Sequence, residues 1–223
     1  MGKLNKTALN EQHVQLGANM VEFGGWEMPL HYETGIVQEH LITRKAAGLF
    51  DISHMGRFIV RGKDALAFLQ HVLSNNAAAL EEEEGQYTMI PNENGGVIDD
   101  AYLYRFVPDE FILVVNAANR EKDFAHLEKI RSHFGEVELV DRTAEMAMLS
   151  LQGPMSKDIM QTLISAGRLP EPMRNCLSTA QINGSQVLIS RTGYTGEPIC
   201  FELFIASKDV AAIWDKLIDK GVR

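Results

Sequence analysis

The sequence predicts an α+β protein in which helices pack against antiparallel sheets. Short alternating apolar segments are interleaved with segments of helical periodicity, and turn-forming residues separate them. The 223 residues are 45% hydrophobic and 23% charged, a composition typical of an ordinary globular chain. The sequence has no internal repeat of fixed period, which argues against a solenoid.

The first half of the chain is expected to contain a helix over residues 36–47, where apolar side chains share one stripe and Gly48 follows. A strand at 58–60 comes next, and a helix with Leu66, Leu69 and Val72 facing inward begins near Asp64. Further expected elements are a three-stranded meander (86–90, 97–105 and 111–116), a helix over 124–130 and a strand at 137–140.

The second half is expected to begin with a strand at 147–151, which Gly153 and Pro154 separate from a helix over 159–164. Strand segments follow at 181–190 and 200–205. Ser207 should open a last helix with Trp214 on its apolar face, and Gly221 should end it.

The charge balance and the N-terminal sequence argue against several classes of protein. Asp and Glu outnumber Lys and Arg by 30 to 21, and a nucleic-acid partner is not expected because its phosphates require a clustered basic surface. The N-terminus resembles neither a signal peptide nor a presequence, and no stretch of about 18 apolar residues could span a membrane. We expect a cytoplasmic chain with reduced thiols at Cys176 and Cys200.

The strongest short motifs for nucleotides, zinc and acyl transfer are absent from the sequence. Residues 51–54 include Asp, Ser and His, but residues so close in the chain rarely converge as a catalytic triad. A turn capped by Asp51 or Ser53 is the favoured interpretation. No cluster of Cys and His has metal-ligand spacing, so no metal site is expected.

A pair of adjacent carboxylates, Asp99 and Asp100, follows the turn at Gly95 and Gly96. Strand alternation places the two side chains on opposite faces, so one of them could point into a cavity. A partly desolvated carboxylate can hold an N–H-rich ligand and shuttle a proton. A turn-terminating acidic pair explains the segment equally well, and both interpretations stay open on these residues alone.

Two other segments suggest a ligand site. Residues 191–197 place glycines on either side of Tyr194, which lets backbone approach a ligand closely, although a decorated hairpin loop is the alternative. Glu202 lies among apolar strand residues and would need a partner if buried. Asn116 stands between a strand and a helix, where capping is the expected role.

Taken together, these segments resemble the folate-dependent aminomethyltransferase family, to which the T-protein of the glycine cleavage system belongs. The resembling motifs occur in family order: FGGWEMPL at 23–30, FDISHMG at 50–56, NENGGVIDD at 92–100, VVNAAN at 114–119, QGP at 152–154 and RTGYTGE at 191–197. Several motifs at the correct spacing are far more specific than any one of them.

The resemblance implies a fold of two interlocked ferredoxin-like α/β-layer domains, with the family's C-terminal β-barrel absent. A discontinuous folate-binding domain is expected at 1–56 plus 143–223, and an inserted α+β domain with the Asp pair at 57–142. The sequence ends before the barrel and before a family motif whose Arg helps to bind the folate tail. Loss of that positive charge should weaken binding.

The resemblance also assigns site residues. Asp100, rather than Asp99, matches the catalytic carboxylate that contacts the pterin of tetrahydrofolate. Glu202 matches an acceptor for the pterin N–H groups. The full set of folate-contacting residues that the resemblance implies is Met55, Tyr87, Tyr104, Val114, Asn116, Tyr194 and Glu202.

The implied reaction transfers a one-carbon unit from an aminomethyl group, carried on the lipoyl arm of a carrier protein, to tetrahydrofolate with release of ammonia. A folate-dependent demethylase or methyltransferase with a sulfonium or methylamine donor is one alternative. A folate-binding module without turnover is another, but relatives of that kind carry a Lys-Gly-Cys motif where this chain has Arg191 and its neighbours.

Overall fold

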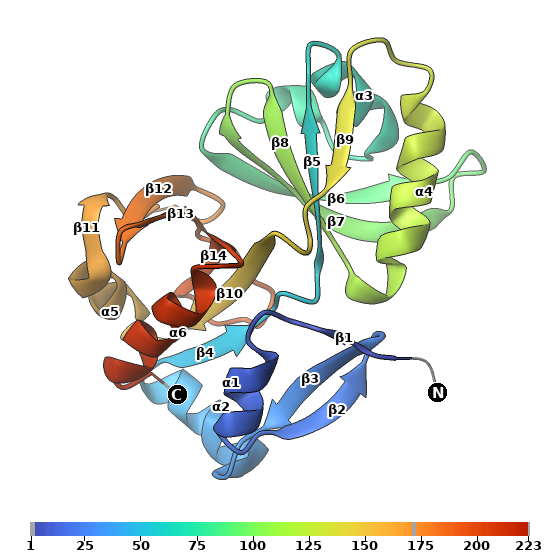
Figure 1. The fold of residues 1–223 in the computed structure, drawn as a ribbon. Coiled ribbons are helices and arrows are strands. Elements are labelled where there is room, and N and C mark those ends of the chain that lie inside the picture. Colours follow the sequence, from blue (N-terminus) through green and yellow to red (C-terminus); the bar gives the residue numbers. More distant parts are fainter. Residues whose placement is uncertain (1–2, 171–172, 223) are drawn as a thin grey trace. The chain divides into compact units, whose positions relative to one another are not determined.

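The computed structural model describes residues 3–170 and 173–222, and the chain separates into two compact units (Figure 1). Unit 1 comprises Met1–His54, Ala144–Arg174 and Ser178–Arg223, and unit 2 comprises Met55–Thr143 and Asn175–Leu177. Both units consist of helices packed on sheets, and the sheets of the described residues form no barrel. The expected α+β class is confirmed.

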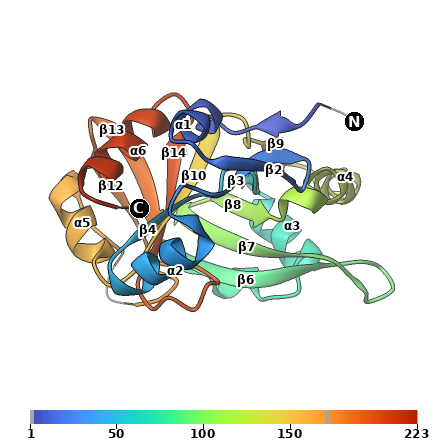
Figure 2. The same cartoon turned by 90° about the horizontal axis from the view of Figure 1, so that it is seen from below.

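Unit 2 contains one antiparallel five-stranded sheet in the order β6-β7-β8-β5-β9. Strands β6, β7 and β8 pair in chain order, which confirms the expected meander. The β6–β7 connection is an extended hairpin (Figure 2), in which the Asn92 carboxamide oxygen accepts the amides of Asn94 and Gly96 at 2.9 and 3.0 Å. The strands are β5 (Gly56–Arg61), β6 (Glu84–Pro91), β7 (Val97–Val107), β8 (Glu110–Val115) and β9 (Glu138–Asp141).

Two helices, α3 (Ala65–Val72) and α4 (Arg120–Arg131), cover one face of this sheet. Phe58, Leu103 and Leu113 from three strands share a core with Phe68 of α3 and Leu127 of α4. Because strand side chains alternate, the residues between these core positions face the opposite side of the sheet. Short 3-10 helices, η1 (Ala77–Ala79) and η2 (Ala117–Asn119), precede β6 and α4.

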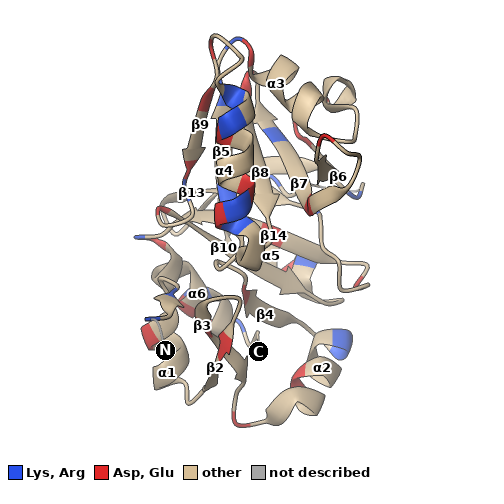
Figure 3. Ribbon diagram, turned by 90° about the vertical axis from the view of Figure 1, so that its right-hand side faces the viewer, with Lys and Arg blue, Asp and Glu red and all other residues tan. Residues whose placement is uncertain are grey.

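Charged side chains of both signs lie along α4 (Figure 3). Its first turn carries Glu121 and Asp123 but also Arg120 and Lys122, and its last turn carries Lys129 and Arg131 beside Glu128. Acidic groups near the helix N-terminus and basic groups near the C-terminus each contribute a few tenths of a kcal/mol when they are exposed. Asp123 differs from the others because it is buried.

Unit 1 contains a six-stranded sheet in the order β11-β12-β13-β14-β10-β4 and a three-stranded sheet in the order β1-β3-β2. The strands are β1 (Asn5–Lys6), β2 (Asn19–Phe23), β3 (Trp26–His31), β4 (Gly48–Asp51), β10 (Met146–Gln152), β11 (Ile164–Gly167), β12 (Leu177–Ile182), β13 (Ser185–Ser190) and β14 (Cys200–Ala206). The helices are α1 (Asn10–Gln15), α2 (Gly35–Lys45), α5 (Ser156–Leu163) and α6 (Val210–Asp219).

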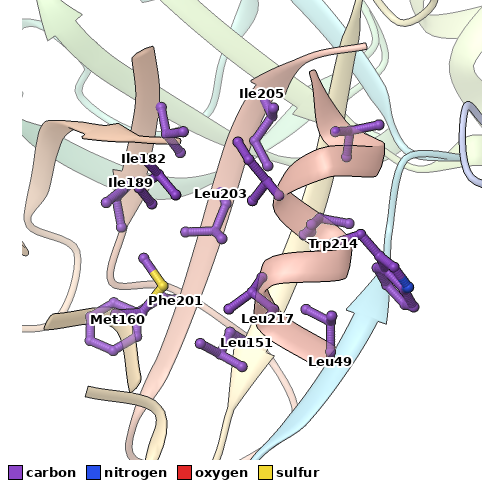
Figure 4. Close-up of a cluster of buried hydrophobic side chains, with 14 of the residues drawn as sticks. Leu49, Leu151, Met160, Ile182, Ile189, Phe201, Leu203, Ile205, Trp214 and Leu217 are labelled. Carbon is purple, nitrogen blue, oxygen red and sulfur yellow. The ribbon is translucent and has the colours of Figure 1, made fainter. Parts of the chain in front are cut away.

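The core of unit 1 forms between α6 and the large sheet (Figure 4). Phe201, Leu203 and Ile205 alternate along β14 on the face that shares this core with α6, and Phe201 lies beside Met160. Each fully buried side chain of this kind contributes about 1.5–3 kcal/mol. The residues between them, including Glu202, face away from this core.

Three boundaries differ from the sequence expectation. The first strand expected from residue 181 begins already at Leu177, and Asn183 and Gly184 adopt positive φ and reverse the chain into β13. Ile164 leaves the preceding helix and pairs with Ile182 in β11. Ser207 does not cap α6, since Asp209 occupies that position and the Ser207 hydroxyl donates to the Ala144 carbonyl at 2.8 Å.

The apolar stripe expected on α2 is largely exposed. Ile36 and Val37 are 59% and 70% exposed, whereas Thr43 is the buried residue of this helix. A side chain on Gly48 would collide with Thr43, whose Oγ1 would lie 2.2 Å from the added Cβ. The helix therefore packs closely on β4 through its last turn rather than through its apolar stripe.

Candidate functional site

The sheet face of unit 2 opposite α3 and α4 carries four of the residues expected at a ligand site. Tyr87 of β6 pairs with Tyr102 of β7, which pairs in turn with Val114 of β8. Asp100 and Tyr104 lie two residues to either side of Tyr102 and therefore share its face. The structure brings the side chains of Tyr87, Asp100, Tyr104 and Val114 to one surface of one sheet.

Asp100 is held by two hydrogen bonds from this group of expected residues. The Tyr87 hydroxyl donates to Oδ2 at 3.1 Å, and the Asn116 side-chain amide donates to Oδ1 at 2.8 Å. Burial and the bond to Asp100 raise the pKa of Tyr87, so its hydroxyl stays a donor. Asp100 is half-buried, and each of its oxygens has a further lone pair with which to accept a ligand N–H.

Aromatic rings extend from Asp100 along the same face. The rings of Tyr87 and Tyr102 meet edge to face at 6.4 Å, and those of Tyr102 and Tyr104 stack at 5.0 Å. Gly85 lies beneath them, and a Cβ there would approach both tyrosine rings to 3.1 and 3.2 Å. A carboxylate beside stacked rings suits a flat, N–H-rich heterocycle.

Asp99 lies on the opposite face of β7, toward α4, as strand alternation predicts. Its oxygens accept the Asn116 amide nitrogen at 3.1 Å, the Asn116 side-chain amide at 3.0 Å and the Asn119 side-chain amide at 2.8 Å. Burial alone would raise the pKa of Asp99, but hydrogen bonds from Asn116, Asp123 and Asn119 lower it. Asp99 is therefore a buried, ionised acceptor with structural partners.

The expected capping role of Asn116 is wrong. It occupies the N-cap position of η2, but its side chain makes no cap hydrogen bond. The side-chain amide instead donates to the carboxylates of both Asp99 and Asp100. Acceptors on both faces of β7 compete successfully with the helix start, so Asn116 links the two carboxylates.

Met55 lies immediately before β5 and is half-buried. Its carbonyl accepts a hydrogen bond from the guanidinium of Arg57, which is fully buried and also donates to the Thr143 carbonyl at 2.5 Å. This backbone role anchors the start of β5. Contact between the Met55 side chain and a ligand stays a prediction.

The remaining two expected residues belong to unit 1. Glu202 is buried on the β14 face that points away from the core, and its Oε2 accepts hydrogen bonds from Thr192 and, at 3.4 Å, from Ser190. Its need for partners when buried is thus met by two hydroxyl groups. Tyr194 is 60% exposed in the loop between β13 and β14.

This loop surrounds a cavity of about 300 Å³. Gly193 has φ of +150° there, and a Cβ would lie 2.5 Å from the Cys200 sulfur, so only glycine fits. Burial raises the pKa of the Cys200 thiol to about 12, which leaves it protonated and unreactive at neutral pH. The cavity is lined by Arg174, Arg191, Thr192, Gly193, Gly196, Glu197, Pro198 and Cys200.

A buried polar cluster in unit 1 escaped the sequence analysis. His13 is fully buried between the Asp51 carboxylate at 3.0 Å and the Tyr32 hydroxyl at 2.8 Å. Asp51 also accepts the Ser53 amide at 2.9 Å, which confirms the expected turn. His13 and Asp51 are 38 residues apart, so no local sequence pattern predicts that they interact.

Within residues 3–170 and 173–222, no group of three or more His, Cys, Asp or Glu side chains is arranged to bind a metal ion. No helix in the same ranges has the length and apolar character needed to cross a bilayer.

The chain is thus an α+β protein in which one antiparallel sheet presents a fixed carboxylate, Asp100, beside aromatic rings. Comparison with known families is specific: residues 9–223 match the GCVT N-terminal domain. The chain belongs to this family.

Individual relatives agree with this membership. The chain is 47% identical over 220 residues to an aminomethyltransferase of Thermus thermophilus, covering 99% of this chain and 62% of the relative. An aminomethyltransferase of Thermotoga maritima is 41% identical over 216 residues, covering 97% and 58%. The chain thus spans about 60% of the length of these curated relatives.

Solved structures agree as well. The crystal structure of glycine cleavage system aminomethyltransferase T from Bartonella henselae superimposes with a TM-score of 0.84 at 35% identity, covering 99% of this chain and 59% of that one. The heterotetrameric sarcosine oxidase from Corynebacterium sp. U-96 shares the fold, with a TM-score of 0.66 at 16% identity over 97% of this chain and 94% of the matched one.

Proposed function

We propose that this chain is the folate-binding part of an aminomethyltransferase of the glycine cleavage system. The proposed reaction moves a one-carbon unit from an aminomethyl group, carried on the lipoyl arm of a carrier protein, to tetrahydrofolate. The observation that carries the proposal is the carboxylate of Asp100, fixed by Tyr87 and Asn116 in a chain of this family. The reaction takes place in the cytoplasm.

Tetrahydrofolate fits the chemistry of the Asp100 surface. A reduced pterin is flat and carries several N–H groups, which match a half-buried carboxylate with free lone pairs. Tyr87, which is 43% exposed, supplies aromatic contact, and we assign Tyr104 and Val114, which are buried, to the lining behind it. Met55 completes the set that we assign to folate in unit 2.

Asp100 has two roles in the proposed mechanism. It accepts N–H groups of the pterin and so orients the attacking nitrogen toward the aminomethyl carbon. Its negative charge also stabilises the cationic, sulfur-bearing carbon that develops as the C–N bond to ammonia breaks. One folate nitrogen then bonds to this carbon, the carbon–sulfur bond breaks to release the carrier thiolate, and a second folate nitrogen closes the methylene bridge. The two folate nitrogens lose their protons, which pass to the thiolate and to ammonia, and no covalent enzyme intermediate is required.

Within unit 1, we assign Glu202 and Tyr194 to folate. Glu202 can accept ligand N–H groups, and the hydroxyls of Thr192 and Ser190 hold its carboxylate in place. Tyr194, exposed on its glycine-flanked loop, supplies aromatic contact. We assign the folate-binding domain to 1–56 plus 143–223 and the inserted domain, which carries Asp99 and the catalytic Asp100, to 57–142.

The test is the substitution Asp100→Asn in the protein that carries this chain, assayed with lipoylated carrier protein and tetrahydrofolate. We expect transfer to fall by about 10²–10³-fold, because the charge and the acceptor geometry are both lost. The thermal midpoint should stay unchanged, because Asp100 is not in the core.

Asp109→Asn is the matched control. Asp109 is exposed in the β7–β8 turn with φ of 56°, a conformation that Asn adopts readily. This variant should keep full activity. Retention of most activity by D100N would remove Asp100 from the mechanism.

The donor separates this proposal from the alternative enzymes. Turnover with the lipoylated carrier protein supports aminomethyl transfer, whereas turnover of free sulfonium or methylamine compounds supports a demethylase or methyltransferase. Folate binding without turnover of any donor identifies a binding module.

A further inference from the structure

A buried acid lies behind the Asp pair. Asp123 in the first turn of α4 is 0% exposed, and both of its carboxyl oxygens are buried. Among the described residues, no N–H or hydroxyl group donates to either oxygen. The buried carboxyl group of Asp99, which the amides of Asn116 and Asn119 hold in place, is the acid that interacts with it.

Two interacting carboxyl groups in a buried environment favour a single shared negative charge, because two neighbouring anions repel each other strongly. Asp99 has donors from Asn116 and Asn119 to stabilise that charge, and Asp123 has none. The proton therefore resides on Asp123. Burial and the interaction with Asp99 raise the pKa of Asp123 to about 8.

The hydrogen bonds continue from Asp99 to Asp100. An ionised Asp99 only accepts, so it requires the Asn116 side chain to present its NH₂ group rather than its carbonyl oxygen. The same NH₂ group donates to Oδ1 of Asp100 at 2.8 Å. The orientation of Asp100 thus depends on a chain of groups that begins at Asp123.

We propose that Asp123 is a positioning residue: it holds a proton, donates it in a hydrogen bond to Asp99, and thereby keeps Asn116 oriented to fix Asp100. The link to ligand binding rests on the proposed function of Asp100, whereas the proton on Asp123 does not. When the proton leaves for solvent at alkaline pH, two buried anions face each other and the Asp99–Asn116–Asp100 geometry is lost.

The charged surroundings favour a proton on Asp123. Asp99 and Asp100 of β7 both raise its pKa. Lys122 opposes them, but its ammonium points to the Ile98 carbonyl at 2.9 Å. Arg120, earlier in the same helix turn, pairs with Asp141 of β9 at 2.7 Å.

A ligand-free experiment tests the proton. In ¹⁵N-labelled protein, the side-chain NH₂ signals of Asn116 and Asn119 should shift with a midpoint near pH 8 in the wild type. The variant Asp123→Asn replaces the O–H donor with a permanent N–H donor, so its signals should not shift in this range. Absence of a wild-type transition between pH 6 and 10, or the same transition in D123N, would overturn the proposal.

A binding experiment tests the link to Asp100. If only the protonated form has the competent geometry, the dissociation constant of tetrahydrofolate rises about tenfold at one pH unit above the midpoint. D123N should show less than a twofold change between pH 7 and 9. A pH-independent wild-type dissociation constant would contradict the link between Asp123 and Asp100.

The two experiments separate failure of the inference from failure of the proposed function. If the wild type binds no tetrahydrofolate at any pH, the proposed function fails, and the NH₂ titration still decides whether Asp123 holds the proton. If D123N does not fold, ¹³C-labelled aspartate in the wild type replaces it. One carboxyl carbon should titrate near pH 8, and its absence would overturn the proposal.

Discussion

The two faces of the β6–β9 sheet treat neighbouring carboxylates differently. Asp99 faces α4, is 7% exposed and accepts three amide hydrogen bonds. Asp100 faces the other side, is half-buried and has lone pairs available beyond its bonds to Tyr87 and Asn116. The two adjacent aspartates therefore differ in role, because protein donors occupy the oxygens of Asp99 but leave lone pairs on Asp100.

Whether a carboxylate can bind a ligand depends on whether its oxygens have lone pairs that the protein does not already use. A carboxylate whose oxygens are all occupied holds structure together, and its removal leaves buried donors without partners. A carboxylate with spare acceptor capacity can bind a ligand, and its removal costs the fold little.

Asp99→Asn should lower the free energy of unfolding by about 3 kcal/mol, because an amide NH₂ would face the donors of Asn116 and Asn119. Asp100→Asn should change stability by less than about 0.5 kcal/mol. Urea unfolding followed by circular dichroism measures both. Equal losses in the two variants would remove the distinction between the faces.

Asp123→Asn should reveal the proton on Asp123 through the pH dependence of stability. The folded wild type keeps this proton up to a pKa of about 8, whereas the unfolded chain releases it near the ordinary value of 3.8. Wild-type stability therefore falls as pH rises within this window, and the Asn variant lacks this loss.

The free energy of unfolding of D123N minus that of the wild type should increase by about 1.4 kcal/mol for each pH unit between pH 5 and 7. Above pH 8 the difference should level off. Urea titrations at each pH supply the measurement. A constant difference across this range would show that Asp123 carries no proton.

Tyr87→Phe should leave stability unchanged and should lower transfer efficiency less than Asp100→Asn does. It removes the hydroxyl that donates to Asp100 at 3.1 Å on a partly exposed surface. A hydrogen bond to a charged group on the surface contributes about 1 kcal/mol, so transfer efficiency should fall about fivefold with stability unchanged. A loss as large as that of D100N would make Tyr87 a catalytic residue in its own right.

Local patterns predicted most of the fold. The meander of unit 2 and the helix over 124–130 follow from alternation, turn residues and apolar spacing, and the structure confirms them. The exposed stripe of α2 was not predictable, because close packing of Thr43 on Gly48 depends on which element lies beside the helix.

The candidate site was predictable only in part. Alternation alone separated Asp99 from Asp100, but the link between them through Asn116 required the three-dimensional register of β7 and β8. Asp123 had a weak local signal, since it precedes Leu127 by one helical turn on the buried stripe of α4. Its partner Asp99 is distant in sequence, so the pair emerges only from the fold.

The central claim is that Asp100 binds the folate substrate. The most direct measurement is the dissociation constant of tetrahydrofolate for the wild-type chain, D100N and D109N at pH 7. We expect D100N to bind about 10–100 times more weakly, because a charge-assisted hydrogen bond is lost, and D109N to match the wild type. Equal dissociation constants for D100N and the wild type would contradict the claim.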